Sequence, residues 1–461
     1  MGDGIRCKLH HCKLKGNVMS IKQDLVAIFQ AGLKAVDPEV AIKRHVRKEG
    51  SLLILGSHSV DLKEIERVYV IGAGKGTAPM AVALEDILGE RISDGAVTVK
   101  YGHGLPLRRI RLFEAGHPVP DEAGVRATEE LLRIARKAGD KDLIIAAFSG
   151  GGSALTPAPV APVGLEEKQE VTRLLLACGA TIGEINAIRK HLSRIKGGGL
   201  ARAAYPARIF SLILSDVVGD LLDVIASGPT APDPTTFEDC LRIIDKYGIR
   251  PDVPEKVLKV LEEGVAGVRP ETPKKGDPVF NNVVNLIVGN NFMALDAAQQ
   301  EATKRGYRTL IMTSRMEGEA REVAKVISAI AKECAATGRP VSPPACFLFG
   351  GETTVTIKGD GLGGRNQELA LACAVELDGW NNIWVLSAGT DGTDGPTDVA
   401  GAFADGQTVS KARNAGIDAL DYLRRNDSFN FFKATGDHLH IGPTRTNVMD
   451  MVCVIVAASG S

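Results

Sequence analysis

The sequence predicts an α/β protein with two α/β domains, each built on a mostly parallel sheet flanked by helices. Apolar runs of strand length alternate with helical patterns over most of the 461 residues, and this alternation is typical of parallel sheets covered by helices. Glycine accounts for 51 residues, about 11% of the chain against a typical ~7%. Many of these glycines follow the apolar runs, which suits loops that approach a ligand closely.

The first domain is expected to span residues 19–270 and to begin with a helix at Met19. Residues 1–18 lack helical or strand periodicity, so we expect them to form a disordered leader. Four apolar runs predict strands, and periodic segments between them predict helices. The strands are 68–71, 95–100, 143–148 and 209–214, and the helices include 121–138, 165–177, 183–195 and 236–246.

The domain boundary is expected near 270–280, because proline and charged residues interrupt the alternation there. A second α/β domain then fills residues 281–461. Its predicted strands are 283–289, 307–313, two within 345–359, 383–389 and 451–458, and its helices are 291–305, 317–336 and one from Asn366. Ligands of open α/β sheets bind at the C-terminal ends of strands, so the loops at those ends are the candidate sites.

Charge and hydropathy argue against several classes of protein. Lys plus Arg total 55 and Asp plus Glu total 56, a net charge of −1, so we expect no nucleic-acid or membrane partner. No apolar run reaches the ~18 residues of a transmembrane helix. The eight cysteines are scattered, mostly in apolar or helical segments, as in reduced cytosolic proteins, so we expect a cytoplasmic location. The oligomeric state is left open, with a homodimer as one option.

The segment 67–88 predicts a strand, a glycine turn of sequence GAGKG that contains Lys75, and a helix. Such turns often place a phosphate at a helix N-terminus. The dinucleotide motif G-x-G-x-x-G is incomplete because Thr77 replaces the third glycine. The Walker A motif fails because Tyr69 and Gly76 occupy its first-glycine and Ser/Thr positions. Lys75 is either a functional, catalytic cation or a solvated lysine in a tight turn.

A second glycine loop directly follows a predicted core strand. It consists of Ser149, Gly150, Gly151, Gly152 and Ser153. Consecutive glycines leave backbone amides able to converge on an anion, and the two hydroxyls add donors. We favour a phosphate-binding loop for the nucleotide over a merely flexible loop.

The segment 186–201 predicts a basic helix that ends in three glycines. Arg189 and Lys190 are candidates to bind a substrate carboxylate or phosphate, although a solvated basic face is the simpler interpretation. His191 could be catalytic, but a histidine in such a helix is more often structural. Lys196 is expected to be more peripheral.

Carboxylates follow two of the predicted strands. Asp216 and Asp220 come after the strand that ends at residue 214, and Asp391 lies in an Asp- and Gly-rich loop after 383–389. Mg²⁺ takes one or two carboxylates together with substrate phosphates. Asp216, Asp220 and Asp391 are therefore candidate metal ligands, and Asp216 is also a candidate catalytic residue. An Asp-Gly turn is the alternative for the last loop.

Two charged residues of the second domain are also candidates. Arg365 stands on a glycine-rich turn that leads into a helix, and arginine suits bidentate recognition of a carboxylate or a transferring phosphoryl group. Glu352 follows Gly350-Gly351, and we include it among the expected substrate contacts. Glycine loops, several cations and acids at strand ends form the set that phosphoryl transfer requires.

The sequence resembles the glycerate 2-kinases of the MOFRL type. Seven motifs carry the likeness, in order, from about residue 20 to the end: GAGKGTAPM, FSGGGSAL, NAIRKHLSRIKGGGLA, SDVVGDLLDVIASGPTAPD, FGGETTVTIKGDGLGGRNQELALA, SAGTDGTDGPTDVAGA and GPTRTNV. The resemblance implies a Rossmann-like N-terminal domain, a MOFRL-type C-terminal domain and an active site in the cleft between them. It implies phosphorylation of D-glycerate to 2-phosphoglycerate with ATP and a divalent cation such as Mg²⁺, and functional roles for Lys75 and Arg365.

Two other functions are considered. Members of this family have also been labelled hydroxypyruvate reductases, and such an enzyme would need NAD(P)H, against which the incomplete dinucleotide motif argues. A non-catalytic sugar-acid-binding protein would leave the many charged loop residues without a purpose. The sequence does not decide which loop binds ATP and which binds glycerate, although the loop 149–153 is favoured for phosphates.

Overall fold

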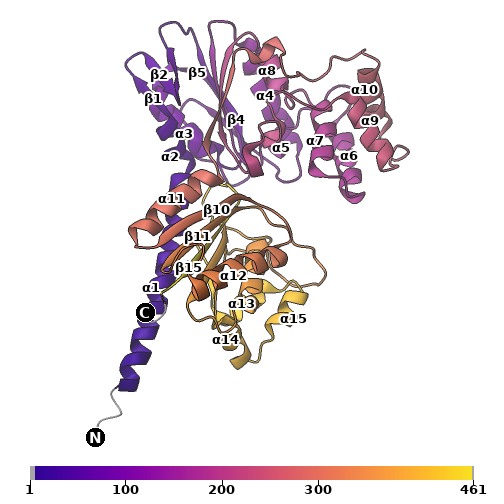
Figure 1. Ribbon diagram of the computed structural model, residues 1–461. Coiled ribbons are helices and arrows are strands. Elements are labelled where there is room, and N and C mark those ends of the chain that lie inside the picture. The colour runs from indigo at the N-terminus through magenta and orange to yellow at the C-terminus, as the bar shows by residue number, and fades with distance from the viewer. Residues whose placement is uncertain (1–5, 459–461) are drawn as a thin grey trace. The chain divides into compact units, whose positions relative to one another are not determined.

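The structure is a computed structural model that describes residues 6–458, with side chains described from Ser20 onward. It divides into two compact units (Figure 1). One unit is Pro38–Gly289, and the other combines the residues up to Asp37 with those from Asn290 onward. Each unit contains a six-stranded sheet covered by helices, so the predicted α/β class is confirmed.

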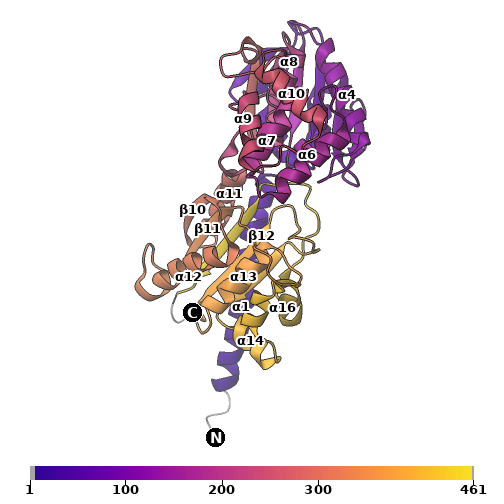
Figure 2. The same ribbon diagram turned by 90° about the vertical axis from the view of Figure 1, so that its right-hand side faces the viewer.

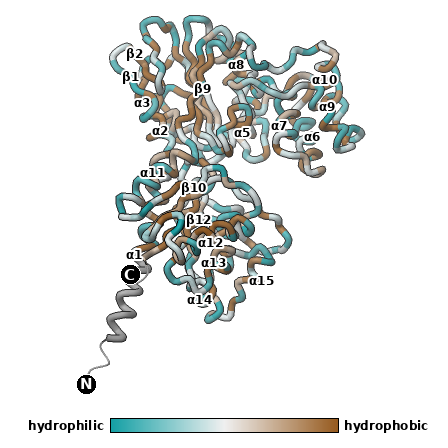
Figure 3. The backbone as a smooth tube through the Cα atoms, in the orientation of Figure 1, coloured by the Kyte–Doolittle hydropathy of each residue, from teal (hydrophilic) through white to brown (hydrophobic). Residues whose placement is uncertain are grey.

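The unit Pro38–Gly289 is built on a sheet in which all strand pairings are parallel. The strand order is β6-β5-β4-β7-β8-β9, which is the order of a doubly wound sheet. The strands are β4 (Val68–Ala73), β5 (Ile92–Lys100), β6 (Arg111–Ala115), β7 (Leu143–Phe148), β8 (Arg208–Leu214) and β9 (Val283–Gly289). Hydrophobic segments lie in the strands of both six-stranded sheets (Figure 3).

Helices cover both faces of this sheet. Tyr69 and Ile71 of β4 share a buried core with α4 (Glu122–Lys137) and α8 (Gly199–Ala204). Side chains alternate along a strand, so Val68 and Val70 face the other side, where α3 (Thr77–Leu88) packs together with α2 (Pro38–His45). A small antiparallel sheet precedes β4 and consists of β1 (Val46–Glu49), β2 (Leu52–Leu55) and β3 (His58–Asp61).

Four helices inserted in the β7–β8 and β8–β9 connections form a group beside this sheet (Figures 1 and 2). They are α6 (Leu165–Ala177), α7 (Ile182–His191), α9 (Phe237–Lys246) and α10 (Glu255–Val265). They share a hydrophobic core of their own, which includes Leu175, Ile188, Phe237 and Leu261. None of the described helices is long and apolar enough to cross a membrane.

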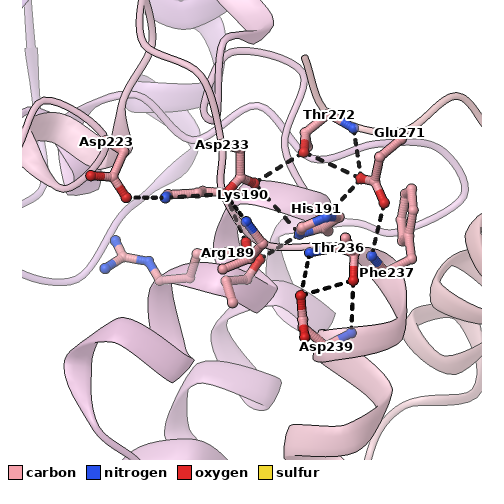
Figure 4. A network of polar contacts seen from close by, with 12 residues as sticks. Arg189, Lys190, His191, Asp223, Asp233, Thr236, Phe237, Asp239, Glu271 and Thr272 are labelled. Atoms are coloured by element: carbon pink, nitrogen blue, oxygen red, sulfur yellow. Dashed lines mark hydrogen bonds and ion pairs between the residues drawn. The ribbon is translucent and has the colours of Figure 1, made fainter. Parts of the chain in front are cut away.

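A polar network joins α7 to the segments around Asp233 and Glu271 (Figure 4). The Lys190 Nζ lies 3.1 Å from Asp223 and 3.3 Å from Asp233. His191 is buried, and its Nε2 lies 2.9 Å from Glu271. His191 is therefore a structural residue that fixes α7 to the neighbouring segments.

The second unit contains a mixed sheet of order β10-β11-β15-β12-β13-β14. β10 pairs with β11 in parallel, whereas β15 runs antiparallel to both β11 and β12, and β13 is antiparallel to β12 and β14. The prediction of a mostly parallel sheet is wrong for this unit, because the last strand returns between two earlier ones. The strands are β10 (Arg308–Met316), β11 (Ala345–Gly351), β12 (Ile383–Gly389), β13 (Gly401–Asp405), β14 (His438–Leu439) and β15 (Asp450–Val456).

Helices again cover both faces. Val452 and Val454 of β15 share a core with α12 (Ala320–Thr337) and α13 (Arg365–Glu376). Met451 faces the opposite side and meets α1 (Arg6–Ala35), where a Cβ on Gly32 would lie 2.6 Å from its Cε. α11 (Asn291–Lys304) packs beside α1. Three shorter helices complete the unit: α14 (Thr408–Asn414), α15 (Ala419–Arg424) and α16 (Ser428–Thr435).

The unit boundaries differ from the predicted domains 19–270 and 281–461. Strand 283–289 was expected in the second domain but pairs with β8 as the edge strand of the first sheet. Helix α1 was expected in the first domain, but it buries Leu25 and Phe29 and packs against α11 and β15, which belong to the same unit as α1. Hydrophobic periodicity indicates that these segments are buried, but it carries no information about the sheet on which they pack.

Two local predictions also differ from the structure. Of the predicted leader 1–18, residues 1–5 lie outside the described residues, and the backbone is helical from Arg6 onward as part of α1. The second strand expected within 345–359 does not form, because β11 ends at Gly351 and Thr354 makes only an isolated bridge with Glu319.

Replacing Lys190 by Met should destabilise the protein by about 3–5 kcal/mol, because the fully buried carboxylate of Asp233 would lose its cation. Thermal unfolding would show this as a lower Tm. Arg189→Met is the matched control, since Figure 4 draws no contact between the guanidinium group of Arg189 and the network, and its Tm should stay near that of the wild type. An unchanged Tm in Lys190→Met would mean that the network does not stabilise α7.

Candidate active site

Two loops meet where β4 and β7 end side by side. These strands are parallel neighbours in the middle of the sheet. The chain leaves β4 toward β5 on one side and leaves β7 toward β8 on the other side. This is the topological switch point at which ligands bind in open α/β sheets. The loops that meet there contain Lys75 and residues 149–153.

Hydrogen bonds lock the two loops together. The amide of Lys75 donates to the carbonyl oxygen of Gly150 at 2.8 Å, and the amide of Gly76 donates to Ser149 Oγ at 2.9 Å. Gly74 has φ +146°, and a Cβ there would lie 2.1 Å from Ser149 Oγ. The hydroxyl of Ser149 is thus used to fix the loops, so we do not keep Ser149 as a phosphate contact.

Some backbone amides of the predicted phosphate-binding loop 149–153 are hydrogen-bonded within the fold, and others remain available to a ligand. The amides of Ser149 and Gly152 are used within the fold, donating to the carbonyl oxygens of Ala73 and Ser149. The amides of Gly150 and Gly151 donate to no acceptor in the part of the chain that the structure describes. Consecutive amides of this kind suit the binding of phosphate oxygens.

Lys196 holds the other end of this loop. Its Nζ donates to the carbonyl oxygen of Ser153 at 2.5 Å and lies 3.0 Å from Ser153 Oγ, which in turn lies 2.7 Å from Ser227 Oγ. The side chain is buried, and burial lowers the pKa of Lys196 well below its ordinary value. The prediction that Lys196 is peripheral is wrong, because the fold turns this residue inward after α7.

His117 lies beside Lys75, and the sequence had not singled it out. A Cβ on Gly151 would lie 2.9 Å from the His117 ring and 3.5 Å from Lys75 Cγ, so the glycine leaves room for both side chains. Burial, together with the positive charge of Lys75, lowers the pKa of His117 to about 4. The ring is therefore neutral at physiological pH. His117 follows β6, a strand that the sequence analysis did not predict. The feature of the sequence that could have indicated a functional residue here is the Gly-His-Pro turn at residues 116–118.

Asp216 lies at the same edge of the sheet, directly after β8 and Ser215. Burial raises the pKa of Asp216 to about 6, and the positive charge of Lys75 acts in the opposite direction. Lys75, Asp216 and the amides of the glycine loop are therefore brought together by the switch point. Asp220 follows in a short 3-10 turn with φ +57°.

The two basic residues predicted as substrate contacts are separated by the fold. Lys190 is 3% exposed and held by Asp223 and Asp233, so the structure assigns it to the network of Figure 4 instead of a binding site. The guanidinium group of the neighbouring Arg189 makes no contact with that network in Figure 4, and Arg189 lines a cavity together with residues of α6.

The second unit places Arg365 among carboxylates. Arg365 begins α13, and Asp450 begins β15 between the ends of β11 and β12. The Arg365 Nε and Nη2 lie 2.6 and 3.1 Å from the carboxylate of Asp450, and Nη1 lies 2.7 Å from Glu352. Burial by itself lowers the pKa of Arg365, but the charges of Asp450 and Glu352 raise it above its ordinary value. Glu352 is thus a partner of Arg365.

Asp391 and Asp394 have local structural contacts. The buried carboxylate of Asp394 accepts the backbone amides of Asn366 and Gln367 at 3.0 and 2.9 Å, which caps the first turn of α13. Asp391 accepts the amide of Thr393 at 3.1 Å, as in the Asp-Gly turn considered above.

The described side chains contain no group of three His, Cys, Asp or Glu residues that could hold a metal ion. The candidate ligands Asp216 and Asp220 lie in one unit and Asp391 in the other.

Comparisons with known proteins agree with this architecture. Residues 24–262 match the family model of a domain of unknown function, DUF4147. A putative hydroxypyruvate reductase of Agrobacterium vitis is 41% identical over 449 residues, which are 96% of this chain and 97% of that protein. The crystal structure of a glycerate kinase from Thermotoga maritima gives a TM-score of 0.85 at 40% identity, covering 95% of this chain and 100% of that chain.

Two further matches define the family. Residues 345–450 match the MOFRL family model. A D-glycerate 2-kinase of Thermotoga maritima is 41% identical over 438 residues, which are 95% of this chain and 99% of that protein. The chain belongs to the glycerate 2-kinase family of the MOFRL type.

Proposed function

We propose that this protein transfers the γ-phosphoryl group of ATP to the C2 hydroxyl of D-glycerate and releases 2-phosphoglycerate and ADP. The observation that carries this proposal is the grouping of Lys75, Asp216 and the amides of Gly150 and Gly151 at the switch point. Phosphoryl transfer needs a cation, donors for phosphate oxygens and a group that orients the nucleophile. The similarity to a D-glycerate 2-kinase supports the choice of substrate.

The transfer forms a bond between the C2 oxygen and the γ-phosphorus and breaks the bond from that phosphorus to the bridging oxygen of ADP. The proton of the C2 hydroxyl passes to the carboxylate of Asp216. A pKa of about 6 keeps Asp216 ionised at neutral pH and makes it a stronger base than an ordinary aspartate. The ammonium of Lys75 stabilises the negative charge that spreads over the moving group. His117, which is neutral, adds a hydrogen-bonding ring without adding charge.

Arg365 is proposed as a second functional cation. Asp450 and Glu352 take three of its N–H donors and fix the plane of its guanidinium group. A guanidinium group has five donors in all, so two remain for an anionic substrate as far as the described residues are concerned. Glu352 then positions Arg365 instead of contacting the substrate directly.

A divalent cation such as Mg²⁺ is proposed as the cofactor. Asp220 lies in the loop after β8 and offers the hard carboxylate oxygens that Mg²⁺ prefers, with substrate phosphates as its remaining ligands. Asp216 in the same loop is the alternative ligand if it does not act as the base. When bound, it would neutralise charge on the polyphosphate.

We also propose a cytoplasmic location, which is supported by the free thiols of the six described cysteines.

Reduction of hydroxypyruvate is the second candidate function. It is favoured by the putative hydroxypyruvate reductase that is 41% identical and by a strand order that dinucleotide-binding domains also use. We rank it second because Thr77 stands where such domains need the third glycine, and its hydroxyl lies 3.2 Å from Ser149 Oγ in the loop junction.

An assay with purified enolase distinguishes these activities. Enolase acts on 2-phosphoglycerate directly, whereas 3-phosphoglycerate first requires a mutase. With D-glycerate, ATP, Mg²⁺ and enolase, phosphoenolpyruvate should accumulate and can be followed by its absorbance. Product that appears only after addition of mutase would contradict transfer to the C2 hydroxyl. Oxidation of NADH by hydroxypyruvate without ATP would support the reductase.

Lys75→Met should lower kcat/KM about 10²- to 10³-fold, because it keeps the side-chain volume but removes one positioned charge from the phosphoryl-transfer site. The Tm should change little, since the loop is fixed by backbone and Ser149 contacts. Lys137→Met, at an exposed position near the end of α4, is the control and should keep full activity. Normal turnover in Lys75→Met would make Lys75 a solvated lysine in a tight turn.

Asp216→Asn should lower kcat by about 10²-fold or more, because it removes the proton acceptor. In the wild type, kcat/KM should rise with pH through about 6, as Asp216 loses its proton. This rise should be absent from the residual activity of Asp216→Asn. If high Mg²⁺ restores the variant, Asp216 serves as a metal ligand instead of a base.

A further inference from the structure

A cavity of about 630 Å³ lies between the glycine loop and helices α6 and α7. It is lined by the loop 118–120, by Ser153 and by side chains of the two helices. Its size is within the ~300–1,000 Å³ of small-molecule sites, and it would leave much empty space around a three-carbon acid such as glycerate. All of its lining residues belong to the unit Pro38–Gly289.

Three basic residues that have no carboxylate partner among the described residues line this cavity: Lys168, Arg189 and Lys196. Within the part of the chain that the structure describes, the Nζ of Lys168 donates to two carbonyl oxygens, those of Leu192 and Arg189, at 3.1 and 3.4 Å. Lys196 donates to Ser153. The guanidinium of Arg189 forms no hydrogen bond or ion pair with the described residues, and Figure 4 shows it directed away from Asp233 and Glu271.

The electrostatic environment of Lys168 and Arg189 differs from that of the nearby Lys190. Burial, together with the positive charge of Arg189, lowers the pKa of Lys168 to about 7, and burial also lowers the pKa of Arg189. Lys190, one residue away, has two carboxylate partners. Concentrated positive charge without counter-charge is costly to bury, and an anionic ligand would remove this cost.

The cavity also has apolar lining residues. Val119, Leu176 and Ile182 are 65%, 64% and 64% exposed, and Ile185 is buried. Large exposed apolar side chains that cluster around a cavity indicate a ligand with an apolar surface. A ligand that combines a flat apolar ring with several negative charges matches both sets of lining residues.

The loop 149–153 links this cavity with the proposed reaction centre. At one end, Ser153 contacts Lys196 in the cavity wall. Closer to its middle, Gly151 adjoins Lys75 and His117. The polyphosphate chain of a nucleotide bound at Lys196 can therefore extend along the loop toward Lys75.

We propose that this cavity is the nucleotide-binding site. The phosphates contact Arg189, Lys168 and Lys196, and the adenine base lies against Val119, Leu176 and Ile182. This assignment rests on the proposed function and moves Arg189 from glycerate to the nucleotide. Two glutamates also line the cavity. Glu166 is exposed to solvent, and Glu170 is neutralised by Arg173 at 2.6 Å.

Calorimetric titration of the full chain with ADP tests the assignment. Arg189→Met should weaken ADP binding about 10- to 100-fold, because it removes a charge-assisted contact from a partly desolvated site. Lys168→Met should weaken it similarly, and its Tm is measured because Lys168 also bonds to the end of α7. Arg173→Met is the matched control, since Arg173 lines the same cavity but is 68% exposed and paired with Glu170, and its Kd for ADP should change less than about twofold.

Photolabelling gives a test that does not depend on a variant. An 8-azido derivative of ADP should label peptides from the loop 118–120 or from residues 165–185, as identified by mass spectrometry. An unchanged Kd for ADP in Arg189→Met, or labelling elsewhere in the chain, would overturn the proposal. Weaker glycerate binding with unchanged ADP binding would assign the cavity to glycerate. If ADP binding depends on Arg189 but no phosphoglycerate forms, the nucleotide site stands and the proposed kinase function fails.

Discussion

The hydroxyl of Ser149 connects the two loops on which the candidate site of the first unit depends. β4 and β7 end at the same edge of the sheet, and the loops that follow them have to pass each other closely. Gly74 makes the approach feasible because any Cβ there would collide with Ser149. The hydrogen bond from the Gly76 amide then fixes the turn that carries Lys75. The position of Lys75 relative to Gly151 and His117 follows from this junction.

The distribution of counter-charge separates structural cations from those that can bind a ligand. Lys190 is neutralised by two aspartates and stabilises the packing of α7. Arg365 is held in place by Asp450 and Glu352, with part of its donor set still accessible. Arg189, only one position from Lys190 in sequence, has no such partner among the described residues and lines a cavity. A substrate that brings its own negative charge would complete the environment of Arg189 in the way that the aspartates complete that of Lys190.

Two relatives that are equally similar to this chain are named for different activities. A D-glycerate 2-kinase and a putative hydroxypyruvate reductase both share 41% identity over nearly the whole chain. A doubly wound sheet can serve either reaction, so the fold does not discriminate between them. The local chemistry does: the contact of Thr77 with Ser149 occupies the place of the third glycine, whereas Lys75 and a carboxylate with a raised pKa suit phosphoryl transfer.

The sequence by itself determined the α/β class, most of the strands and helices, the glycine loops and the family, because these depend on local periodicity and on short motifs. It placed Lys75, Asp216 and the loop 149–153 at strand ends that the fold brings to one edge. Only the tertiary structure decided that β9 belongs to the first sheet, that α1 packs with the second, and that Lys190 and Arg189 have different environments. The physical reason is that pairing partners, counter-ions and cavities are formed by residues far apart in the chain, and no pattern within a single segment specifies them.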